Sequence, residues 1–291
     1  MSGTFGERLA DAVAARGPLC VGIDPHAPLL ERWGLPDSPE GLARFTDTVV
    51  DALAGTVAVL KPQLAFYERH GSRGLAVLED AVGRARAAGA LVLLDAKRGD
   101  IGSTMDAYAD YLRPGHPLAV DAMTVSPFLG PGSLQPAVDT ARMHGGGLFV
   151  LARTSNPDAG TLQHAVVAER SVAQVVVDTV RGWNTSGWVV GDPLPDVAAV
   201  RDQASRFGPA TGSFGVVVGA TLRELDVDLD GLGGPILAPG LGAQGGSVAD
   251  LRRLFGSGRA VVPTVSRDVL SAGPDPAGLR AAADRWTTAL R

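Results

Sequence analysis

Three ionisable side chains fall within six residues of this sequence, where an apolar run ends. Leu91 to Leu94 are apolar, and Asp95, Lys97 and Asp100 follow. A short run without polar residues is typical of a strand buried on both faces. If the chain is still extended at Asp95 and Lys97, the two-residue period of a strand places both side chains on one side, within reach of each other. Such a pair can hold or transfer a proton, although D-x-K alone is also a common surface ion pair.

Lysine is rare in this chain. Of the 26 basic residues only Lys61 and Lys97 are lysine, and the other 24 are arginine. Both lysines end apolar runs. A lysine ammonium is compact and its pKa responds to burial and to neighbouring charges, so it can transfer a proton or form an imine where arginine cannot. This usage points to a chemical role for both lysines.

The composition is that of a globular protein. The 291 residues are 45% apolar and no linker divides them, so we expect one domain over residues 1–291. The formal charge of −5 and the scattered arginines give no basic face for nucleic acid. Cys20 is the only cysteine, which excludes an internal disulfide and a cysteine-based metal site and fits a reducing cytoplasm. There is neither a leader-like N-terminus nor an apolar run of about 18 residues, so we expect a cytoplasmic protein that does not bind a membrane.

Eight apolar runs alternate with helix-like stretches. The runs predict strands at 19–23, 57–60, 91–94, 119–125, 147–151, 214–218, 235–238 and 260–264. Helices are expected at 39–53, 74–88, 162–183 and 195–207 and at the C-terminus. Asp100 is placed to open another helix, with Ile101, Met105, Tyr108 and Leu112 at core spacing. Eight strand–helix units favour a closed (β/α)8 TIM barrel of the α/β class over an open doubly wound sheet.

Polar residues that follow these strands form the candidate site. In a barrel the carboxyl ends of all strands meet at one rim, where active sites lie. The residues expected to converge there are Asp24, Lys61, Asp95, Lys97, Ser126, Thr154, Thr221, Gln244 and Arg267. The loops after the last two strands often bind phosphate; residues 239–246 are glycine-rich and Arg267 adds a forked cation. The pattern therefore predicts phosphate binding at this part of the rim.

Several of these strand-end motifs together resemble the orotidine 5'-phosphate decarboxylases, in particular their actinobacterial-type branch. The run Asp95-Ala-Lys-Arg-Gly-Asp-Ile-Gly-Ser-Thr104 is similar to that family's D-x-K-x-x-D-I-x-x-T signature. Four other segments resemble the remaining motifs of the family and occur in the same order. They are Val21-Gly-Ile-Asp-Pro25, Lys61-Pro-Gln63, residues 238–245 and Ser266-Arg267. The resemblance runs from about residue 19 to residue 268.

The resemblance implies conversion of orotidine 5'-monophosphate to uridine 5'-monophosphate (UMP) and CO2 without a cofactor or metal, the last step of de novo pyrimidine biosynthesis. It implies that Lys97 protonates C6 of the pyrimidine, that Asp95 lies beside the departing carboxylate, and that Lys61 and Asp100 complete a charge network. Members of the family are homodimers, so Asp100 is expected to reach into the partner's site and touch the ribose.

The same resemblance implies the substrate contacts. It assigns them to Asp24, Thr104, Ser126, Thr154, Ser155, Gly242, Gln244 and Arg267. Asp24 and Lys61 would hold the ribose hydroxyls, and Arg267 and Gln244 would hold the phosphate. Some relatives carry a basic residue where this chain has Gly242, so phosphate binding here would depend more on Arg267 and on backbone N–H groups.

Three alternatives remain open at this point. A related barrel decarboxylase of sugar phosphates uses the D-x-K-x-x-D pattern with Mg²⁺, either lysine could form an aldolase-like imine, or the barrel could bind nucleotides without catalysis. The second strand carries no further carboxylate cluster, and none of the five histidines is paired at ligand spacing, which argues against a metal. An intact Asp-Lys-Asp set argues against a non-catalytic barrel.

Overall fold

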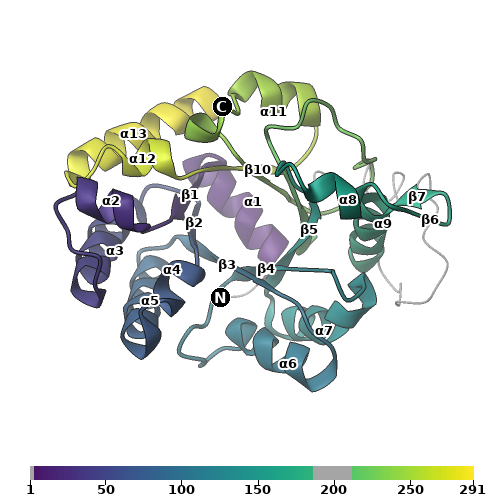
Figure 1. The fold of residues 1–291 in the computed structure, drawn as a ribbon, viewed down its shortest axis with the longest axis horizontal. Helices are drawn as coiled ribbons and strands as arrows, with labels where there is room; N and C mark the ends of the chain where they lie inside the picture. Colours follow the sequence, from purple (N-terminus) through teal and green to yellow (C-terminus); the bar gives the residue numbers. More distant parts are fainter. Residues whose placement is uncertain (1–2, 186–211) are drawn as a thin grey trace.

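Eight parallel strands close into a barrel surrounded by helices (Figure 1) in a computed structural model of the protein, which describes residues 3–185 and 212–291. Around the barrel the strands follow the order β1-β10-β9-β8-β5-β4-β3-β2. They are β1 (Cys20–Ile23), β2 (Val59–Pro62), β3 (Leu91–Arg98), β4 (Ala122–Val125), β5 (Gly147–Arg153), β8 (Phe214–Val218), β9 (Ile236–Pro239) and β10 (Val261–Val265). The (β/α)8 barrel expected from the sequence is confirmed.

The helices cover the outside of the barrel and one of its ends. They are α1 (Phe5–Arg16), α2 (Ala27–Arg32), α3 (Pro39–Leu53), α4 (Ala65–Glu68), α5 (Gly71–Ala87), α6 (Gly102–Ala109), α7 (Gln135–His144), α8 (Ala159–Gln163), α9 (Val172–Trp183), α11 (Val248–Phe255), α12 (Arg267–Leu270) and α13 (Pro276–Leu290), with short 3-10 turns η1 (Asp110–Leu112), η2 (Pro131–Leu134) and η3 (Gly242–Gln244). Helix α3 has the predicted bounds, because Ser38 caps its N-terminus and Pro39 suits its first turn.

The continuous helix expected at 162–183 is wrong. The chain instead forms α8, a small antiparallel hairpin of β6 (Val166–Val167) and β7 (Arg170–Ser171), and then α9. The turn of the hairpin holds Ala168 and Glu169 at φ 48° and 68°, which a helix cannot contain. Ser171 then caps α9 by accepting a hydrogen bond from the Gln174 N–H at 3.1 Å. The helix expected at 195–207 lies outside the described residues.

The helix that Asp100 was expected to open begins later, at Gly102. The Asp100 carboxylate accepts a hydrogen bond from the N–H of Ile101 at 2.8 Å and so does not cap the helix. Ile101 is 63% exposed, whereas Met105 is buried, so the apolar stripe of α6 begins one turn later than the spacing predicted.

Helix α1, which the sequence analysis did not identify, closes the amino-terminal end of the barrel (Figure 1). Thr4 and Glu7 form a capping box at its start. Phe5 and Leu9 join the core cluster inside the barrel, and the Phe5 ring packs edge-on against Phe149 with centroids 5.9 Å apart. The interior of the barrel is therefore filled at this end, and its pocket lies at the carboxyl ends of the strands.

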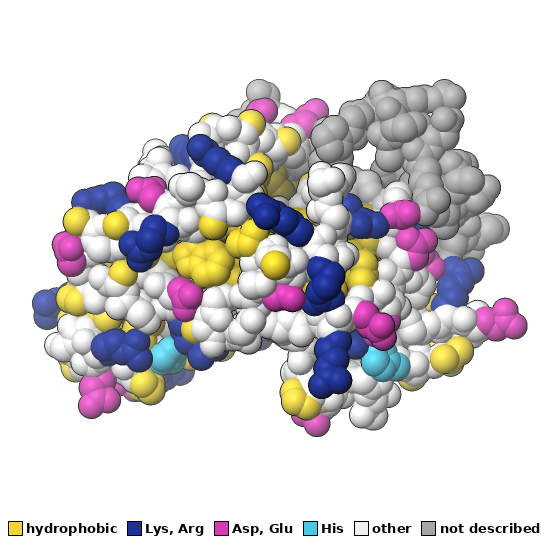
Figure 2. Space-filling view, turned by 90° about the horizontal axis from the view of Figure 1, so that it is seen from above, with side chains coloured by type: hydrophobic (Ala, Val, Ile, Leu, Met, Phe, Trp, Pro, Cys, Tyr) yellow, Lys and Arg dark blue, Asp and Glu magenta, His cyan; other side chains and the backbone are white. Residues whose placement is uncertain are grey.

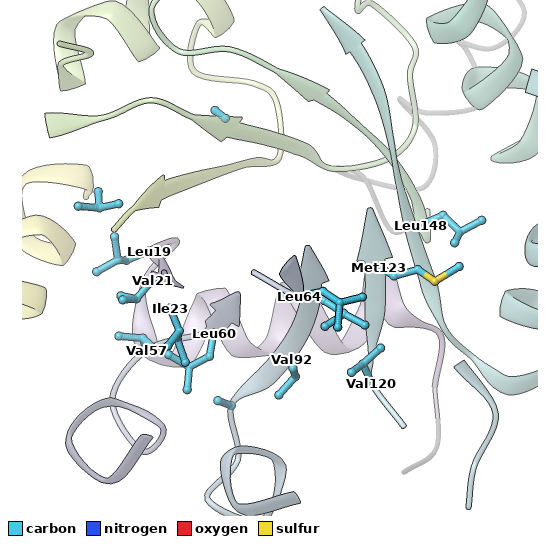
Figure 3. Close-up of a cluster of buried hydrophobic side chains, with 14 of the residues drawn as sticks. Leu19, Val21, Ile23, Val57, Leu60, Leu64, Val92, Val120, Met123 and Leu148 are labelled. Carbon is cyan, nitrogen blue, oxygen red and sulfur yellow. The ribbon is translucent and has the colours of Figure 1, made fainter. Parts of the chain in front are cut away.

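The larger core lies between the barrel and its outer helices. Figure 3 shows part of it, where Val21, Leu60 and Val92 of neighbouring strands point outward toward the helices. Burial of these branched side chains is what holds helix and strand layers together, since removal of apolar surface from water is the main favourable term in folding. The strands thus form a rigid support for the residues at their carboxyl ends.

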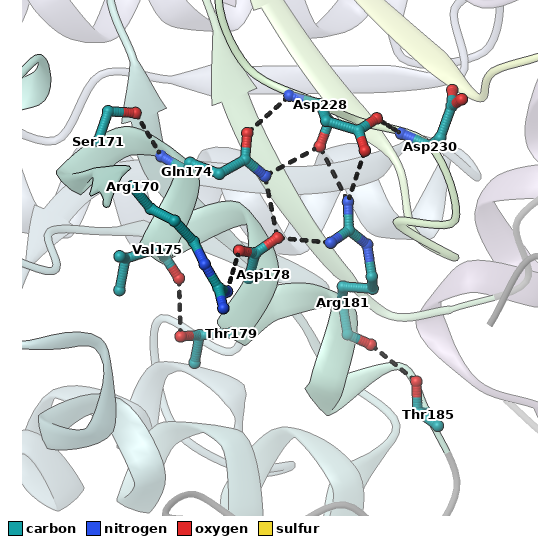
Figure 4. Close-up of polar contacts among 10 residues, drawn as sticks. All are labelled: Arg170, Ser171, Gln174, Val175, Asp178, Thr179, Arg181, Thr185, Asp228 and Asp230. Carbon is teal, nitrogen blue, oxygen red and sulfur yellow. Dashed lines mark hydrogen bonds and ion pairs between the residues drawn. The ribbon is translucent and has the colours of Figure 1, made fainter. Parts of the chain in front are cut away.

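A buried polar network fixes α9 against the segment that follows β8 (Figure 4). Asp178 accepts hydrogen bonds from Arg170 at 2.8 Å and from Arg181 at 2.5 Å, and the second Arg181 nitrogen donates to the Asp228 carbonyl at 2.9 Å. Gln174 adds bonds to both Asp178 and Asp228. These bonds join α9 to the segment at several points, so the network can hold the segment in one position.

The described surface mixes basic and acidic side chains. On the face in Figure 2 they alternate, and neither charge covers a continuous area of the coloured surface. Within the described ranges, none of the helices combines the length and apolar character that a membrane crossing requires.

Candidate active site

The carboxyl ends of the strands surround a pocket of about 260 Å³. Seven of the residues predicted for the site line it: Asp24, Lys61, Asp95, Lys97, Thr154, Gln244 and Arg267. Apolar side chains of Leu151, Val217 and Leu237 also line it. Four polar residues there were not assigned from the sequence, namely Gln63, Thr124, Thr264 and Ser266. Each lies at or just after a strand end, so the rule that found the other residues could have found these too.

The Asp95 carboxylate is the centre of the polar site. Its Oδ2 accepts hydrogen bonds from Lys61 Nζ at 2.6 Å and from Gln63 Nε2 at 3.0 Å. Its Oδ1 accepts from Lys97 Nζ at 2.6 Å and from Thr124 Oγ1 at 2.9 Å. Four donors from three adjacent strands thus fix one carboxylate between two ammonium groups. The predicted contact between Asp95 and Lys97 is confirmed, but Lys97 has φ 49° and not the extended conformation from which the contact was predicted.

Burial and charge act on this cluster in opposite directions. Burial disfavours ionisation of Asp95, but the positive charges of Lys61 and Lys97 outweigh it and hold the pKa of Asp95 well below its usual range. Burial likewise disfavours the charged form of Lys61, but Asp95 and Asp24 raise its pKa above the usual range. Both groups are therefore charged throughout the neutral pH range.

The carboxyl end of β3 is irregular, and it places the side chains of Asp95 and Lys97 in the pocket. Between the paired positions Leu94–Met123 and Arg98–Val125, β3 advances four residues while β4 advances two. The extra residues form a bulge in which Lys97 adopts φ 49°, a rare conformation for a residue other than glycine. The Thr124 hydroxyl accepts the Lys97 N–H at 3.0 Å and so helps to hold that conformation. Strain kept in place by its surroundings is common at functional sites.

Gly99 allows the chain to leave the bulge close to β4. A Cβ at this position would lie 2.3 Å from the Ser126 carbonyl oxygen, which backbone atoms do not tolerate. The Ser126 N–H donates to the Arg98 carbonyl at 2.8 Å, which joins the two strand exits. The glycine of the D-x-K-x-x-D run is thus required by close packing.

Three oxygen atoms at one end of the pocket are buried and have no hydrogen-bond partner among the described residues. They are Asp24 Oδ1, Thr264 Oγ1 and Ser266 Oγ. Strands β1 and β10 are neighbours, with Val21 opposite Val265, so their ends bring Asp24 and Ser266 together. Buried polar atoms usually have partners, and those that lack one in a pocket are free to bind a polar ligand.

The glycine-rich loop after β9 is folded back on itself. The N–H groups of Gly242 and Gly246 donate to the carbonyls of Gly246 and Gly240, and the Ala243 N–H donates to Asp268 Oδ1 at 2.9 Å. Gly242 has φ 68°, and a Cβ there would lie 2.2 Å from Asp268 Oδ2, so a basic side chain does not fit this conformation. Arg267 is exposed and its guanidinium pairs with no other described residue, which leaves its five N–H donors free.

Thr154 is fixed at the pocket by a side chain of α8. Gln163 Oε1 accepts the Thr154 N–H at 2.9 Å, and Gln163 Nε2 donates to Thr154 Oγ1 at 2.8 Å. The Thr154 hydroxyl in turn donates to Asn156 Oδ1 at 2.7 Å. The amide of Gln163 therefore sets both the backbone and the rotamer of Thr154.

Other residues expected at the site do not line the pocket. They are Asp100, Thr104, Ser126, Ser155, Thr221 and Gly242. Thr104 and Ser155 are exposed, and Asp100 lies on the loop before α6 beside the exposed Ile101. Among the described residues no basic side chain pairs with Asp100. Over these ranges, too, no three His, Cys, Asp or Glu residues come together in a way that could hold a metal ion.

Comparison with known proteins extends over nearly the whole chain. Residues 17–282 match the family model described as "Orotidine 5'-phosphate decarboxylase / HUMPS family". The orotidine 5'-phosphate decarboxylase of Salinispora arenicola is 58% identical over 285 residues, which cover 97% of this chain and 95% of the relative. That of Streptomyces coelicolor is 56% identical over 290 residues, 99% of this chain and 97% of the relative.

A solved structure agrees with these relatives. The crystal structure entitled "Crystal structure of putative orotidine 5'-phosphate decarboxylase from Streptomyces avermitilis ma-4680" is of a protein 55% identical to this chain. The match covers 100% of this chain and 95% of that protein, with a TM-score of 0.86. The strand-end motifs, the closed barrel and the sequence identity to actinobacterial relatives lead to one conclusion: this chain belongs to the orotidine 5'-phosphate decarboxylase family.

Proposed function

We propose that this enzyme decarboxylates orotidine 5'-monophosphate to UMP and CO2, with Lys97 as the proton donor and without a cofactor. The observation that carries the proposal is the Lys61–Asp95–Lys97 array, with both N–O distances at 2.6 Å, on the floor of a pocket that matches the family's site motifs. Loss of CO2 leaves a negative charge on C6 with no adjacent π system to take it up. A fixed cation beside C6 stabilises that charge as it develops.

The proposed reaction conserves atoms and charge. The bond between C6 and the carboxylate breaks, CO2 leaves, and the electron pair remains on C6. A proton from the Lys97 ammonium moves to C6, and Lys97 then regains a proton from water. Asp95 holds the Lys97 ammonium in position through a 2.6 Å hydrogen bond, and the buried Lys61 keeps Asp95 ionised. Preorganised charges of this kind need no reorientation during the reaction.

The remaining pocket residues fit the rest of the nucleotide. We assign the ribose to the end of the pocket with Asp24 and Lys61, where Asp24 Oδ1 is buried without a partner. Arg267 and Gln244 are assigned to the phosphate, because the Arg267 guanidinium lies beside the loop after β9 and pairs with no residue within 3–185 or 212–291. Thr154 is assigned to the base, together with Ser155 and Ser126, which lie on neighbouring strand exits. Gly242 acts through its backbone in shaping the phosphate loop.

We propose further that the enzyme is a homodimer in which Asp100 and Thr104 act in the partner's site. Asp100 and Thr104 lie outside the pocket of their own chain, next to Ile101, which is 63% exposed. Phe128 and Leu129, on the exit of the adjacent strand, are exposed as well. Exposed apolar side chains beside a carboxylate that no described basic residue pairs with suit an interface that carries a functional residue.

We also propose one domain over residues 1–291 and a cytoplasmic location. The larger core cluster joins residues from Leu19 to Ala283 and so supports a single domain. The lone, buried Cys20 suits a reducing compartment. The acidic net charge of −5 supports a small nucleotide, rather than nucleic acid, as the partner.

A spectrophotometric assay tests the proposed reaction. Purified protein treated with excess EDTA should lower the absorbance of orotidine 5'-monophosphate as it releases CO2. Turnover under these conditions would support both the reaction and its independence of divalent metal. If turnover is absent, and activity on a sugar phosphate appears when Mg²⁺ is restored, the function belongs to the metal-dependent type of barrel decarboxylase instead.

A further inference from the structure

A second polar cavity lies at the opposite, amino-terminal end of the barrel. It has a volume of about 230 Å³ and is lined by three side chains that carry nitrogen donors, Arg8, Arg86 and His144, together with Asp121. Asp121 directly precedes β4, and Arg86 lies in the last turn of α5, before β3. We propose that this cavity binds a small oxyanion of the size of inorganic phosphate.

The first observation is the distribution of buried polar atoms that lack a hydrogen-bond partner. The described residues contain ten such side-chain atoms. Three belong to residues of the catalytic pocket, and three more, Arg8 Nε, Arg86 Nε and His144 Nε2, belong to residues that line the second cavity. Unpartnered buried donors are rare in proteins because each costs desolvation free energy. Arg8 Nε and Arg86 Nε are donors, and His144 Nε2 donates in its Nε2–H tautomer, so their concentration at one cavity points to a ligand that accepts hydrogen bonds.

The second observation is the balance of charge. Two guanidinium groups face one carboxylate, so the cavity carries an excess of one positive charge. The Asp121 carboxylate is already bound, with Oδ2 accepting the Val92 N–H at 2.9 Å and Oδ1 accepting from Arg8 Nη2 at 3.0 Å. Arg86 Nη2 donates to Asp121 Oδ1 at 3.5 Å, and Arg86 Nε lies 3.3 Å from Asp121 Oδ2 without hydrogen-bond geometry. The carboxylate fixes the two cations without using all their donors.

The two arginines are also fixed from the wall of the cavity. Arg8 Nη1 donates to the Gly145 carbonyl at 2.9 Å, and Arg86 Nη1 donates to the Ala119 carbonyl at 2.9 Å. A ligand would therefore meet donors already held in position, which lowers the entropic cost of binding. Charge-assisted hydrogen bonds from arginine are the interactions that proteins use for phosphate and carboxylate groups.

The lining also limits the size and class of the ligand. Apart from the imidazole of His144, the described lining of the cavity holds no aromatic ring, so it offers a nucleotide base no other stacking partner. The apolar lining is limited to side chains such as Leu112, Pro114 and Val120, which is little surface for a lipid or a larger organic molecule. A free tetrahedral or planar oxyanion fits the donor set best.

Equilibrium dialysis with radiolabelled inorganic phosphate tests the site. His144→Leu is the informative variant, because its Nε2 bonds to no described residue and its removal breaks no such hydrogen bond. Saturating UMP is added so that only phosphate binding outside the catalytic pocket is measured. Under this condition we expect His144→Leu to weaken phosphate binding roughly tenfold, because one hydrogen bond to a charged group is lost. Arg86→Gln should weaken the same site.

His70→Leu is the control, since His70 Nε2 is also buried without a hydrogen bond to a described residue but lies outside the cavity, 3.6 Å from Asp37 Oδ1. It should leave phosphate binding unchanged. The proposal is overturned if wild type binds no phosphate in the presence of UMP, which would mean that the cavity holds only water. It is equally overturned if wild type and His144→Leu bind phosphate alike. Folding of His144→Leu is checked by its thermal unfolding, so a weakened site in a folded variant supports the proposal.

Discussion

Lys97 reaches Asp95 from a backbone conformation that a lysine rarely adopts. Its Nζ lies 2.6 Å from Asp95 Oδ1 while its own φ is 49°. The bulge in β3 and the hydrogen bond from the Lys97 N–H to Thr124 hold this geometry. The structure thus fixes the ammonium before any substrate arrives, which is the preorganisation that charge stabilisation requires.

Replacement of Arg267 should mainly weaken binding of the phosphate. We expect Arg267→Ala to reduce affinity for UMP by about 2–4 kcal/mol, because a charged, hydrogen-bonded partner is lost. Affinity for uridine, which lacks the phosphate, should change little. Calorimetric titration of both ligands measures the difference, and Arg280→Ala, on the exposed face of α13, controls for loss of one positive charge. An equal loss for uridine would contradict the assignment of Arg267 to the phosphate.

The lowered pKa of Asp95 makes part of the stability depend on pH. A carboxyl group whose pKa is lower in the folded state stabilises the protein above its unfolded pKa of about 3.9, and this contribution is lost as pH falls through the folded pKa. We therefore expect the stability difference between wild type and Asp95→Asn to be constant near neutrality and to shrink below about pH 4.

Urea unfolding of both proteins, from pH 7 down to the lowest pH at which both stay folded, measures that difference. Lys61 does not disturb this measurement, because its raised pKa affects stability only at high pH. Its contribution to stability is complete below the unfolded pKa of about 10.4 and is lost as pH rises through the folded pKa. A stability difference that stays constant through acid pH would show that Asp95 is not held ionised by its two lysines.

Gln163 should affect catalysis through Thr154 without touching the substrate. Gln163→Leu removes both hydrogen bonds to Thr154, so we expect KM to rise several-fold with a smaller change in kcat. Gln163→Glu keeps the acceptor for the Thr154 N–H and should retain more of the affinity. Steady-state kinetics separate the two parameters, and Gln135→Leu, which loses a bond to Asp139 on α7, is the matched control. If Gln163→Leu matches wild type in KM, Thr154 needs no such positioning.

Asp100 should complement a defective partner if it acts across a dimer interface. We expect Lys97→Ala and Asp100→Ala to be inactive alone. In an equal mixture with random pairing, half of the dimers are mixed and each has one intact site, so about a quarter of wild-type activity should return. Refolding the two variants together and assaying turnover measures this. Activity no greater than the sum of the separate variants would place Asp100 in its own chain's site.

The barrel was predictable because its signals are local. Each of the eight short apolar runs, with the polar residue that ends it, can be recognised in the sequence by itself. Closure of the barrel then brings these polar residues together at one rim. Helix α1 was missed because its role depends on tertiary packing, with Phe5 and Leu9 filling the end of the barrel. The hairpin in place of a continuous 162–183 helix was missed because the turn at Ala168 and Glu169 uses positive φ without glycine.

The centre of the site was partly predictable. The two-residue spacing of Asp95 and Lys97 predicted their contact, and the scarcity of lysine drew attention to Lys61. Gln63 and Thr124 lie at strand ends and could have been placed at the rim, but their bonds to Asp95 could not be predicted, because spacing along one strand gives no information on contacts between strands. The bulge that turns Lys97 into the pocket also depends on Thr124 in the neighbouring strand.

The most direct test of the central claim is turnover by Lys97 variants. We expect Lys97→Ala to lower kcat for orotidine 5'-monophosphate by a factor on the order of 10³ or more, with UMP binding largely kept. Lys97→Arg keeps the charge but has a pKa too high to give up a proton, so it should be inactive as well. If Lys97→Ala turns over at nearly the wild-type rate, Lys97 is not the proton donor and the proposed mechanism is wrong.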